Sequence, residues 1–389
     1  MRASVLLGEV IDVASGQVDP RVDPYSDLPH VGGDNIESGS GRLFGVRTAR
    51  ELNLISGKYE FGPDDVLYSK IRPALNKVAL PDFVGICSAD MYPLRSRPAR
   101  IERRYLAYLL RHDDFLSYAE KHSSRTNIPK INRDTLLNYE VRLPPLTEQR
   151  HIADILDNAD AIRRKRKGAI ALTEELLRST FLEMFGDPVT NPKGWPLKPL
   201  GDLLEFLTSG SRGWAQHYTD TGDAFLRIQN VRRDRLDLSD VAYVQAPDSA
   251  EARRTHTRPG DVLLSITADL GRTAVVPPSL DRAFINQHLA ILRPEHIDPE
   301  FLSAFLASEG GQIQINGRNK GGVKAGLNFD DIRSIEVPVP TSKAQQAYAE
   351  AKVRIRGLQL QLSRSFEQSE ALFNSLVSRA FSGSLDATC

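Results

Sequence analysis

The segment Asp65-Val66-Leu67-Tyr68-Ser69 occurs a second time as Asp261-Val262-Leu263-Leu264-Ser265, and this repetition decides the fold. The same offset of 196 positions, as from residue 65 to residue 261, pairs Asn132 with Asn328 and then holds without a gap over residues 131–185. A period this long exceeds the tens of residues that make one unit of a solenoid. The chain is therefore predicted to contain a duplicated pair of domains, and a duplicated binding domain implies a duplicated target.

Length and composition agree with two soluble domains. A chain of 389 residues is too long for one ordinary hydrophobic core. No apolar run approaches 18 residues, and the N-terminal apolar stretch is too short for a signal peptide. The two cysteines, Cys87 and Cys389, cannot build a disulfide framework or a cysteine-based zinc site. We expect the protein to lie in a reducing cytoplasm.

The net charge is zero, with 50 basic and 50 acidic side chains, but the charges are unevenly distributed. Residues 95–133 contain ten Lys or Arg against four Asp or Glu, and residues 310–329 contain no acidic residue. A balanced total with basic patches suits a protein that binds DNA with one face and protein with others.

Each copy has two parts of different texture. Residues 1–144 and 188–340 mix short β-branched runs with Gly, Pro and Asp, and helical patterns lie between the predicted strands. Residues 145–187 and 341–385 each read as one long helix. The predicted fold is α+β: two similar α/β domains joined by two long antiparallel helices that form a coiled coil, related by a pseudo-twofold internal repeat.

Apolar side chains recur at spacings of three and four along both helical segments. Thr147 is the expected N-cap of the first. About 38 residues at ~1.5 Å each give a length of roughly 57 Å. We expect the stripe of each helix to be buried against the other. The stripe residues are Ile152, Ile155, Ala159, Ile162, Ala169, Leu176 and Leu177, and in the second helix Tyr348, Ala351, Ile355, Leu358, Leu362, Ser369, Leu372 and Leu376.

The sequence offers no catalytic constellation. Neither Pro-Pro pair, at Pro144 and at Pro277, belongs to the Asn/Asp-Pro-Pro-aromatic motif of adenine amino-methyltransferases. Gly57-Lys58-Tyr59 lacks the remainder of a phosphate-binding loop, and the eight histidines show no metal-ligand spacing. We therefore predict no catalytic residue and no metal ligand.

Recognition chemistry is better represented. Two polar, basic loops precede the matched asparagines, and two further segments follow or contain predicted strands. Their cations can neutralise phosphates, and Asn, Gln and Arg can pair with base edges. The alternative for each is a solvated loop or strand face without a ligand. The DNA-binding candidates are Arg125, Asn127 and Lys130; Arg318, Asn319, Lys320 and Lys324; Arg227, Gln229 and Asn230; and Lys70 and Arg72. The basic run at residues 163–167 is interpreted as a solvated helix segment, because five consecutive helical residues point all around the axis.

Together these features resemble the specificity subunit of type I restriction-modification systems over nearly the whole chain. The resemblance is carried by residues 143–149, with the sequence Leu-Pro-Pro-Leu-Thr-Glu-Gln, and by 195–203, 225–231 and 258–263. The second copy departs from the first motif, since Val339-Pro340-Thr341 lacks the Pro-Leu step and Ala344 replaces the glutamate.

The resemblance implies a non-catalytic subunit that reads a bipartite DNA target, with the helices setting the spacer between the half-sites. It implies two methyltransferase and two restriction/translocase subunits as partners, which use S-adenosylmethionine, Mg and ATP, and no cofactor on this chain. The alternatives are a coiled-coil scaffold and a specificity protein of another phage-defence methylation system. The candidate subunit-interface residues are Pro144, Pro145, Leu146, Gln149, Ile152, Ile155, Ile162 and Leu176, and Pro340, Gln345, Ile355, Leu362 and Leu372.

Overall fold

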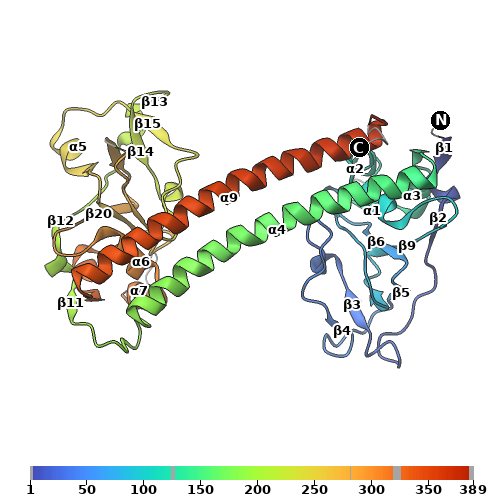
Figure 1. The fold of residues 1–389 in the computed structure, drawn as a ribbon, viewed down its shortest axis with the longest axis horizontal. Helices are drawn as coiled ribbons and strands as arrows, with labels where there is room; N and C mark the ends of the chain where they lie inside the picture. Colours follow the sequence, from blue (N-terminus) through green and yellow to red (C-terminus); the bar gives the residue numbers. More distant parts are fainter. Residues whose placement is uncertain (1–2, 124–127, 281, 319–325, 385–389) are drawn as a thin grey trace. The chain divides into compact units, whose positions relative to one another are not determined.

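Two compact units make up the protein. Met1–Lys167 and Ser365–Cys389 form unit 1, and Gly168–Arg364 forms unit 2. The boundaries fall inside two long helices, α4 (Leu146–Phe185) and α9 (Ser342–Ser382), so each unit holds one part of each helix (Figure 1). The structure, a computed structural model, describes residues 3–123, 128–280, 282–318 and 326–384.

Unit 1 contains two four-stranded sheets and one strand pair. The first sheet has the order β2-β9-β6-β7, from β2 (Ile11–Val13), β6 (Asp65–Ser69), β7 (Val78–Ala79) and β9 (Met91–Ser96). The second has the order β4-β3-β8-β5, from β3 (Pro29–Val31), β4 (Arg47–Thr48), β5 (Tyr59–Phe61) and β8 (Gly85–Cys87). The pair is β1 (Ala3–Leu6) with β10 (Glu140–Leu143), and the helices are α1 (Arg103–Arg111), α2 (Asp113–Lys121) and α3 (Arg133–Leu137).

Unit 2 repeats this plan. One sheet has the order β12-β20-β17-β18, from β12 (Leu204–Ser209), β17 (Val262–Ser265), β18 (Thr273–Val275) and β20 (Leu289–Pro294). The other has the order β13-β15-β14-β19-β16, from β13 (Tyr218–Thr219), β14 (Asp223–Leu226), β15 (Ala242–Val244), β16 (His256–Thr257) and β19 (Ala283–Ile285). The pair is β11 (Leu197–Pro199) with β21 (Glu336–Pro338), and the helices are α5 (Ala250–Thr255), α6 (Pro299–Ala307), α7 (Glu309–Gly317) and α8 (Phe329–Arg333).

The repeat read from the sequence is a repeat in the structure. The expected strands at 65–69 and 261–266 are the central strands β6 and β17, and all residues of both are buried. The matched asparagines, Asn132 and Asn328, cap α3 and α8 with their side chains. This confirms the prediction of two similar α+β domains. Thr147 is not the N-cap of α4, however, because the helix already begins at Leu146.

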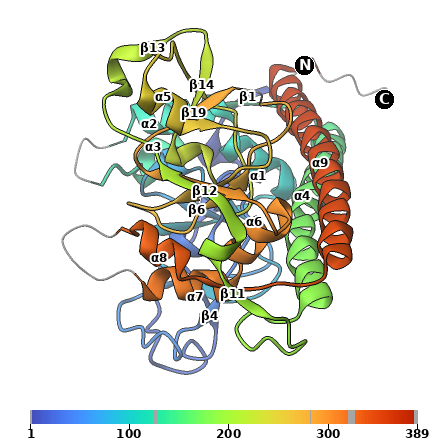
Figure 2. The same ribbon diagram turned by 90° about the vertical axis from the view of Figure 1, so that its left-hand side faces the viewer.

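The helix parts pack against the domain core within each unit. In unit 2, Phe185 of α4 meets Phe301 of α6 edge-on, with ring centroids 4.7 Å apart, and Tyr348 of α9 at 5.4 Å. Figure 2 shows α6 between these helix parts and β12, and α6 contacts β17 and β18 of the same sheet. In unit 1, Tyr105 of α1 lies 5.3 Å from Phe381 of α9. Each long helix is therefore held by the hydrophobic cores of both units.

The stripe expected to be buried between the helices is only partly buried. Ile162 and Leu176 of α4, and Leu358 and Leu372 of α9, are between 45% and 57% exposed. Polar residues share the buried face: Asp160 and Thr173 on α4, and Lys352, Gln359 and the expected Ser369 on α9. The prediction of a continuous apolar seam is wrong at these exposed positions. Among the buried polar side chains, Gln359 donates to Glu174 of α4 at 2.7 Å, whereas the others bond within their own helix or to the domain. No helix among the described residues is long and apolar enough to span a membrane.

Candidate nucleic-acid interface

Three of the cations predicted to bind DNA come together in unit 1. Ile71 and Lys130 form an isolated antiparallel bridge, and the backbone N–H of Arg72 donates to the carbonyl of Pro129 at 2.7 Å. Lys70, one residue before the bridge, places its ammonium 5.1 Å from the centroid of the Tyr92 ring. Segments about sixty residues apart in the sequence thus join into one strap, which we define as residues 70–72 with 128–130.

The strap offers its charges to solvent. Arg72 and Lys130 are exposed, and Lys70 is half-buried. Arg72 has a φ of 47°, in the left-handed region that few non-glycine residues occupy. Three cations on one exposed segment, without an acidic residue in the strap itself, can contact successive phosphates of a nucleic-acid backbone.

The predicted reading segment of unit 2 has a different structure from the one expected. It is not a strand but a short 3-10 helix, Ile228–Asn230, followed by a loop. Asn230 is 1% exposed; its amide oxygen accepts from the Arg227 N–H, and its amide nitrogen donates to the carbonyls of Asp237 and Asp240, both at 3.0 Å. The expected base contact of Asn230 is therefore wrong for this structure, because every polar atom of its side chain closes the loop.

The other two residues of this segment remain near the surface. The Arg227 guanidinium donates to the backbone carbonyl of Asp240 at 3.0 Å, and the Gln229 amide donates to the Asp240 carboxylate at 2.7 Å. Both could exchange these partners for base edges or phosphates. Unit 1 closes its own loop in the same way, since Asn35 accepts from the Gly32 N–H and donates to the carbonyls of Phe44 and Gly45.

Of the candidates in the loop before Asn328, only Arg318 is among the described residues. Its guanidinium donates to the Ser334 hydroxyl at 2.8 Å and to the Gln314 carbonyl at 3.0 Å, which ties the end of α7 to the segment after α8. A DNA contact by Arg318 would have to compete with these bonds. Five other candidates lie outside the described residues: Arg125, Asn127, Asn319, Lys320 and Lys324.

The candidate interface residues divide into buried and exposed sets. Those buried inside their own unit are Pro144, Gln149, Ile152, Pro340 and Gln345, and those at intermediate exposure are Leu146, Ile155, Ile355 and Leu362. The exposed ones are Pro145, Ile162, Leu176 and Leu372. The buried set lies at the junction between domain and helix within each unit, and an interface role for the candidates stays a prediction that the exposed set serves best.

The exposed set follows the repeat. Ile162 of α4 and Leu372 of α9 belong to unit 1, and their counterparts at the 196-residue offset, Leu358 and Leu176, belong to unit 2. Each unit therefore exposes the same pair of large apolar side chains on its helix parts. Exposed apolar side chains at matching places in two copies suit two copies of one protein partner.

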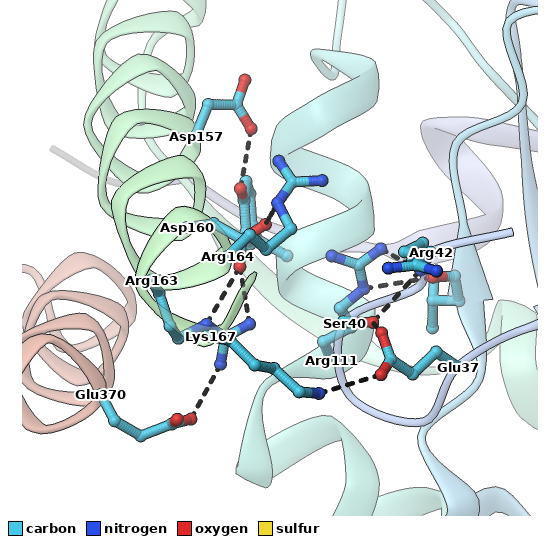
Figure 3. Close-up of polar contacts among 12 residues, drawn as sticks. Glu37, Ser40, Arg42, Arg111, Asp157, Asp160, Arg163, Arg164, Lys167 and Glu370 are labelled. Carbon is cyan, nitrogen blue, oxygen red and sulfur yellow. Dashed lines mark hydrogen bonds and ion pairs between the residues drawn. The ribbon is translucent and has the colours of Figure 1, made fainter. Parts of the chain in front are cut away.

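The basic run at residues 163–167 is not simply solvated. Figure 3 shows Arg163 between Asp160, at 2.6 Å, and Glu370 of α9, at 3.0 Å. Asp160 also pairs with Arg164 at 3.0 Å, and Lys167 pairs with Glu37 of the unit 1 loop at 3.0 Å. The sequence holds a signal that was missed, because Asp160 stands three and four residues before the two arginines, the spacing of helical ion pairs.

One of these ion pairs affects the pKa of a surface carboxylate, that of Glu37. Hydrogen bonds from the Ser40 hydroxyl and the Lys167 ammonium lower the pKa of Glu37 below its usual value. Glu37 is thus held ionised, and its loop is fastened to α4. Within the described residues, no group of three or more His, Cys, Asp or Glu side chains could hold a metal ion.

Comparison with known proteins gives a consistent result. The family described as type I restriction modification DNA specificity domain matches residues 5–172 and 192–351. The type I restriction enzyme EcoDI specificity subunit of Escherichia coli is 35% identical over 186 residues, covering 47% of this chain and 41% of that protein. The chain thus spans less than half of that relative's length in the match.

Solved structures extend the likeness to nearly the whole chain. The type I restriction-modification S subunit from M. genitalium has a TM-score of 0.63 at 14% identity, over 98% of this chain and 96% of that one. A chain from a study of complex assembly and conformational transition of the type I restriction-modification system has a TM-score of 0.59 at 22% identity, over 98% of both chains. At these identities the likeness concerns the fold.

Proposed function

Because the chain belongs to the family of type I restriction-modification DNA specificity domains, we propose that it is the subunit that gives such an enzyme its DNA sequence specificity. The observation that carries the proposal is the match of that family to both copies of the repeat, at residues 5–172 and 192–351. Each unit reads one half of a bipartite double-stranded DNA target, and the two half-sites differ because the two domains differ in sequence.

The strap of unit 1 supports DNA as the ligand. Lys70, Arg72 and Lys130 would neutralise phosphates and fix the register, while Arg227 and Gln229 in unit 2 have the donors needed to read base edges. Phosphate contacts of this kind give an affinity that falls steeply with salt concentration.

The proposed partners are those that the family implies, and the exposed apolar residues of the long helices offer places for them. Chemistry on adenine N6 is assigned to two methyltransferase subunits, which bind S-adenosylmethionine, and cleavage to two restriction/translocase subunits, which use Mg and ATP. The chain itself binds no cofactor in this proposal. The pair Ile162 and Leu372, and its repeat Leu358 and Leu176, provide one apolar contact for each methyltransferase subunit.

The long helices set the distance between the half-sites. Each extends over about 40 residues and is anchored in the cores of both units, so a change in its length must change the spacing of the readers. Insertion of four residues after Ala169 and after its repeat counterpart Ser365 is expected to lengthen the unspecified spacer and to leave both half-sequences unchanged. An unaltered spacer would remove the helices from this role.

The test is a methylation map. The chain is co-expressed with the methyltransferase encoded beside it, and N6-methyladenine is located by single-molecule sequencing with and without the chain. We expect a gapped two-part motif that disappears without the chain. Methylation that is indifferent to the chain, by an active methyltransferase, would favour a coiled-coil scaffold, and a motif made only with a partner from a different defence system would reassign the class.

A further inference from the structure

The two units do not carry their surface cations at the same places. Unit 2 has a strap of the same construction: Thr267 bridges Gly326 as Ile71 bridges Lys130, and Ala268 has a left-handed φ of 65° where Arg72 has 47°. Three cations of the first strap have no cationic counterpart. Lys70, Arg72 and Lys130 of unit 1 correspond to Ile266, Ala268 and Gly326 of unit 2. The described part of this second strap therefore has nothing with which to neutralise phosphate.

Unit 2 instead concentrates cations in a tight turn, Arg232-Arg233-Asp234-Arg235, which we call the arginine turn. The N–H of Arg232 donates to the carbonyl of Arg235 at 2.8 Å, and Thr273 of β18 fastens both ends through its own N–H and carbonyl. All three arginines are exposed. Arg232 pairs with Asp237 at 3.2 Å, whereas no ion pair within 4 Å joins Arg233 or Arg235 to another described residue. Against the effect of burial, the charge of Arg235 is one of those that lower the pKa of Glu174 of α4.

The middle residue of the turn points the other way. Asp234 is in the left-handed conformation, at a φ of 55°, and its carboxylate accepts from the Lys352 ammonium and from the Ser303 hydroxyl, both at 2.6 Å. The side chain of Lys352 is only 5% exposed and also pairs with Glu300 at 2.7 Å. The buried Lys352 thus offsets the acidic charge of Asp234, and the three arginine side chains of the turn remain exposed.

The corresponding turn of unit 1 has the opposite character. The turn occupies the same place in the fold. Asn35 and Asn230 close the two loops with equivalent hydrogen bonds, and Ile36 forms a bridge with Leu43 as Val231 does with Leu236. Its residues 37–42 are Glu-Ser-Gly-Ser-Gly-Arg, and the glutamate is paired with Lys167 of α4. Within the part of the chain that the structure describes, the cations therefore lie on the strap in unit 1 and on the turn in unit 2.

We infer that the arginine turn is the site at which unit 2 binds the DNA sugar-phosphate backbone, in place of the strap used by unit 1, and that Lys352 positions it. This rests on the proposed function and deepens it. Arg233 and Arg235 contact phosphates. Arg227, which caps the 3-10 helix just before the turn, and Gln229 within that helix are thereby brought to the groove. A planar guanidinium binds a phosphate through two N–H groups, which suits a turn with little room to move.

The test uses the complete chain in complex with its methyltransferase subunits and a duplex that carries the mapped motif. Affinity is measured by fluorescence anisotropy between about 50 mM and about 200 mM salt for wild type, for Arg233→Ala/Arg235→Ala, and for Arg354→Ala, an exposed cation of α9, as control. Each lost phosphate contact reduces the slope of log affinity against log salt by about 0.9, so the double variant should have a slope smaller by about 2. Its loss of affinity across this salt range should be roughly tenfold smaller than that of wild type.

Lys352 is tested as a positioning residue. Lys352→Met keeps the arginine side chains but removes the cationic partner of Asp234, so the turn should lose its position. The salt slope should then fall as in the double arginine variant. Combining Lys352→Met with that variant should lower the slope little further. Lys352→Arg, which keeps the charge, should recover part of the slope. Hydroxyl-radical footprints of Arg233→Ala/Arg235→Ala and of Lys352→Met should lose protection in one half-site only, and the footprint of Arg354→Ala should match that of wild type.

Two results would overturn the inference while the proposed function stands. One is an unchanged slope and footprint for Arg233→Ala/Arg235→Ala. The other is an unchanged slope with weaker binding of the methyltransferase, which would assign the turn to an acidic protein surface. If the wild-type complex itself does not prefer the mapped duplex, the proposed function fails first, and the turn fails with it.

Discussion

Gln149 and Gln345 make the same two hydrogen bonds in the two units. The Gln149 amide oxygen accepts from the Glu102 N–H at 2.9 Å, and its amide nitrogen donates to the Pro144 carbonyl at 2.9 Å. Gln345 does the same with Asp298 and Pro340, both at 2.7 Å. Each glutamine thus fastens the residue that caps α1 or α6 to the first turn of a long helix. The junction between each domain and its helix is fixed because one buried amide satisfies a backbone N–H of the domain and a backbone carbonyl before the helix.

Replacement of one of these glutamines should loosen its junction. Gln345→Leu leaves the Asp298 N–H and the Pro340 carbonyl without a partner in a buried place, at a cost of about 1–3 kcal/mol. We expect a lower midpoint in urea unfolding. The adjacent Gln346 is exposed, so Gln346→Leu is the matched control and should change the midpoint little. Equal midpoints for the two variants would show that the hydrogen bonds of Gln345 contribute nothing to stability.

The ion pairs of Figure 3 predict a second stability effect. Arg163→Ala removes the bridge from Asp160 to Glu370, and it also removes a guanidinium that lies 4.4 Å from the centroid of the Phe373 ring. Asp160 keeps Arg164. We expect a loss of about 2 kcal/mol in the free energy of unfolding. Lys165→Ala, at an exposed position of the same helix turn, should lose a few tenths at most.

The repeated apolar pair predicts separable binding of two methyltransferase subunits. Ile162→Lys should weaken binding of one subunit about tenfold, and Leu358→Lys should weaken the other, because each places a charge in an apolar contact. Leu360→Lys is the control: Leu360 is 63% exposed, but its counterpart in the first copy is Arg164, already charged. Analytical ultracentrifugation of the assembled complexes measures the stoichiometry. Loss of both subunits from either single variant would contradict separate sites.

Acid should destabilise unit 1 through His30. Burial, and secondly the charge of Lys58, lower the pKa of His30 from 6.5 to about 4. The unfolded chain therefore takes up a proton first as the pH falls, so the contribution of His30 to stability is complete above pH 6.5 and is lost between 6.5 and about 4, at about 1.4 kcal/mol per pH unit. His30→Gln should flatten the dependence of the unfolding midpoint on pH in this range. His296→Gln, at an exposed histidine, should leave it as in wild type.

Much of the architecture could be predicted from the sequence, because a duplication is visible in the residues themselves. The offset that pairs Asn132 with Asn328 also pairs the two helix caps that these residues form. Burial of the central strands follows from their apolar runs. The cations of the strap were recognised as separate candidates at Lys70, Arg72 and Lys130, but the bridge that unites them joins positions far apart in the chain.

The candidate site was harder to predict. Asn230 has a side chain that could bind a base edge, but it closes its own loop instead, because its amide nitrogen donates to two carbonyls of that loop. The arginine turn contains Asp234, which in sequence dilutes the positive charge. Only in the folded unit does Lys352, 118 residues away, neutralise that carboxylate. Both outcomes depend on which chain segment lies beneath the loop.

The sequence by itself determined that there are two α+β units and two long helices, since periodicity and capping residues are local properties. The tertiary structure decided which face of each helix is buried and which cations remain free. The physical reason is that a helix with apolar and polar residues on several faces can pack in more than one way. The choice falls to partners across the seam, such as Glu370 for Arg163 and Glu174 for Arg356, which come from the other end of the chain.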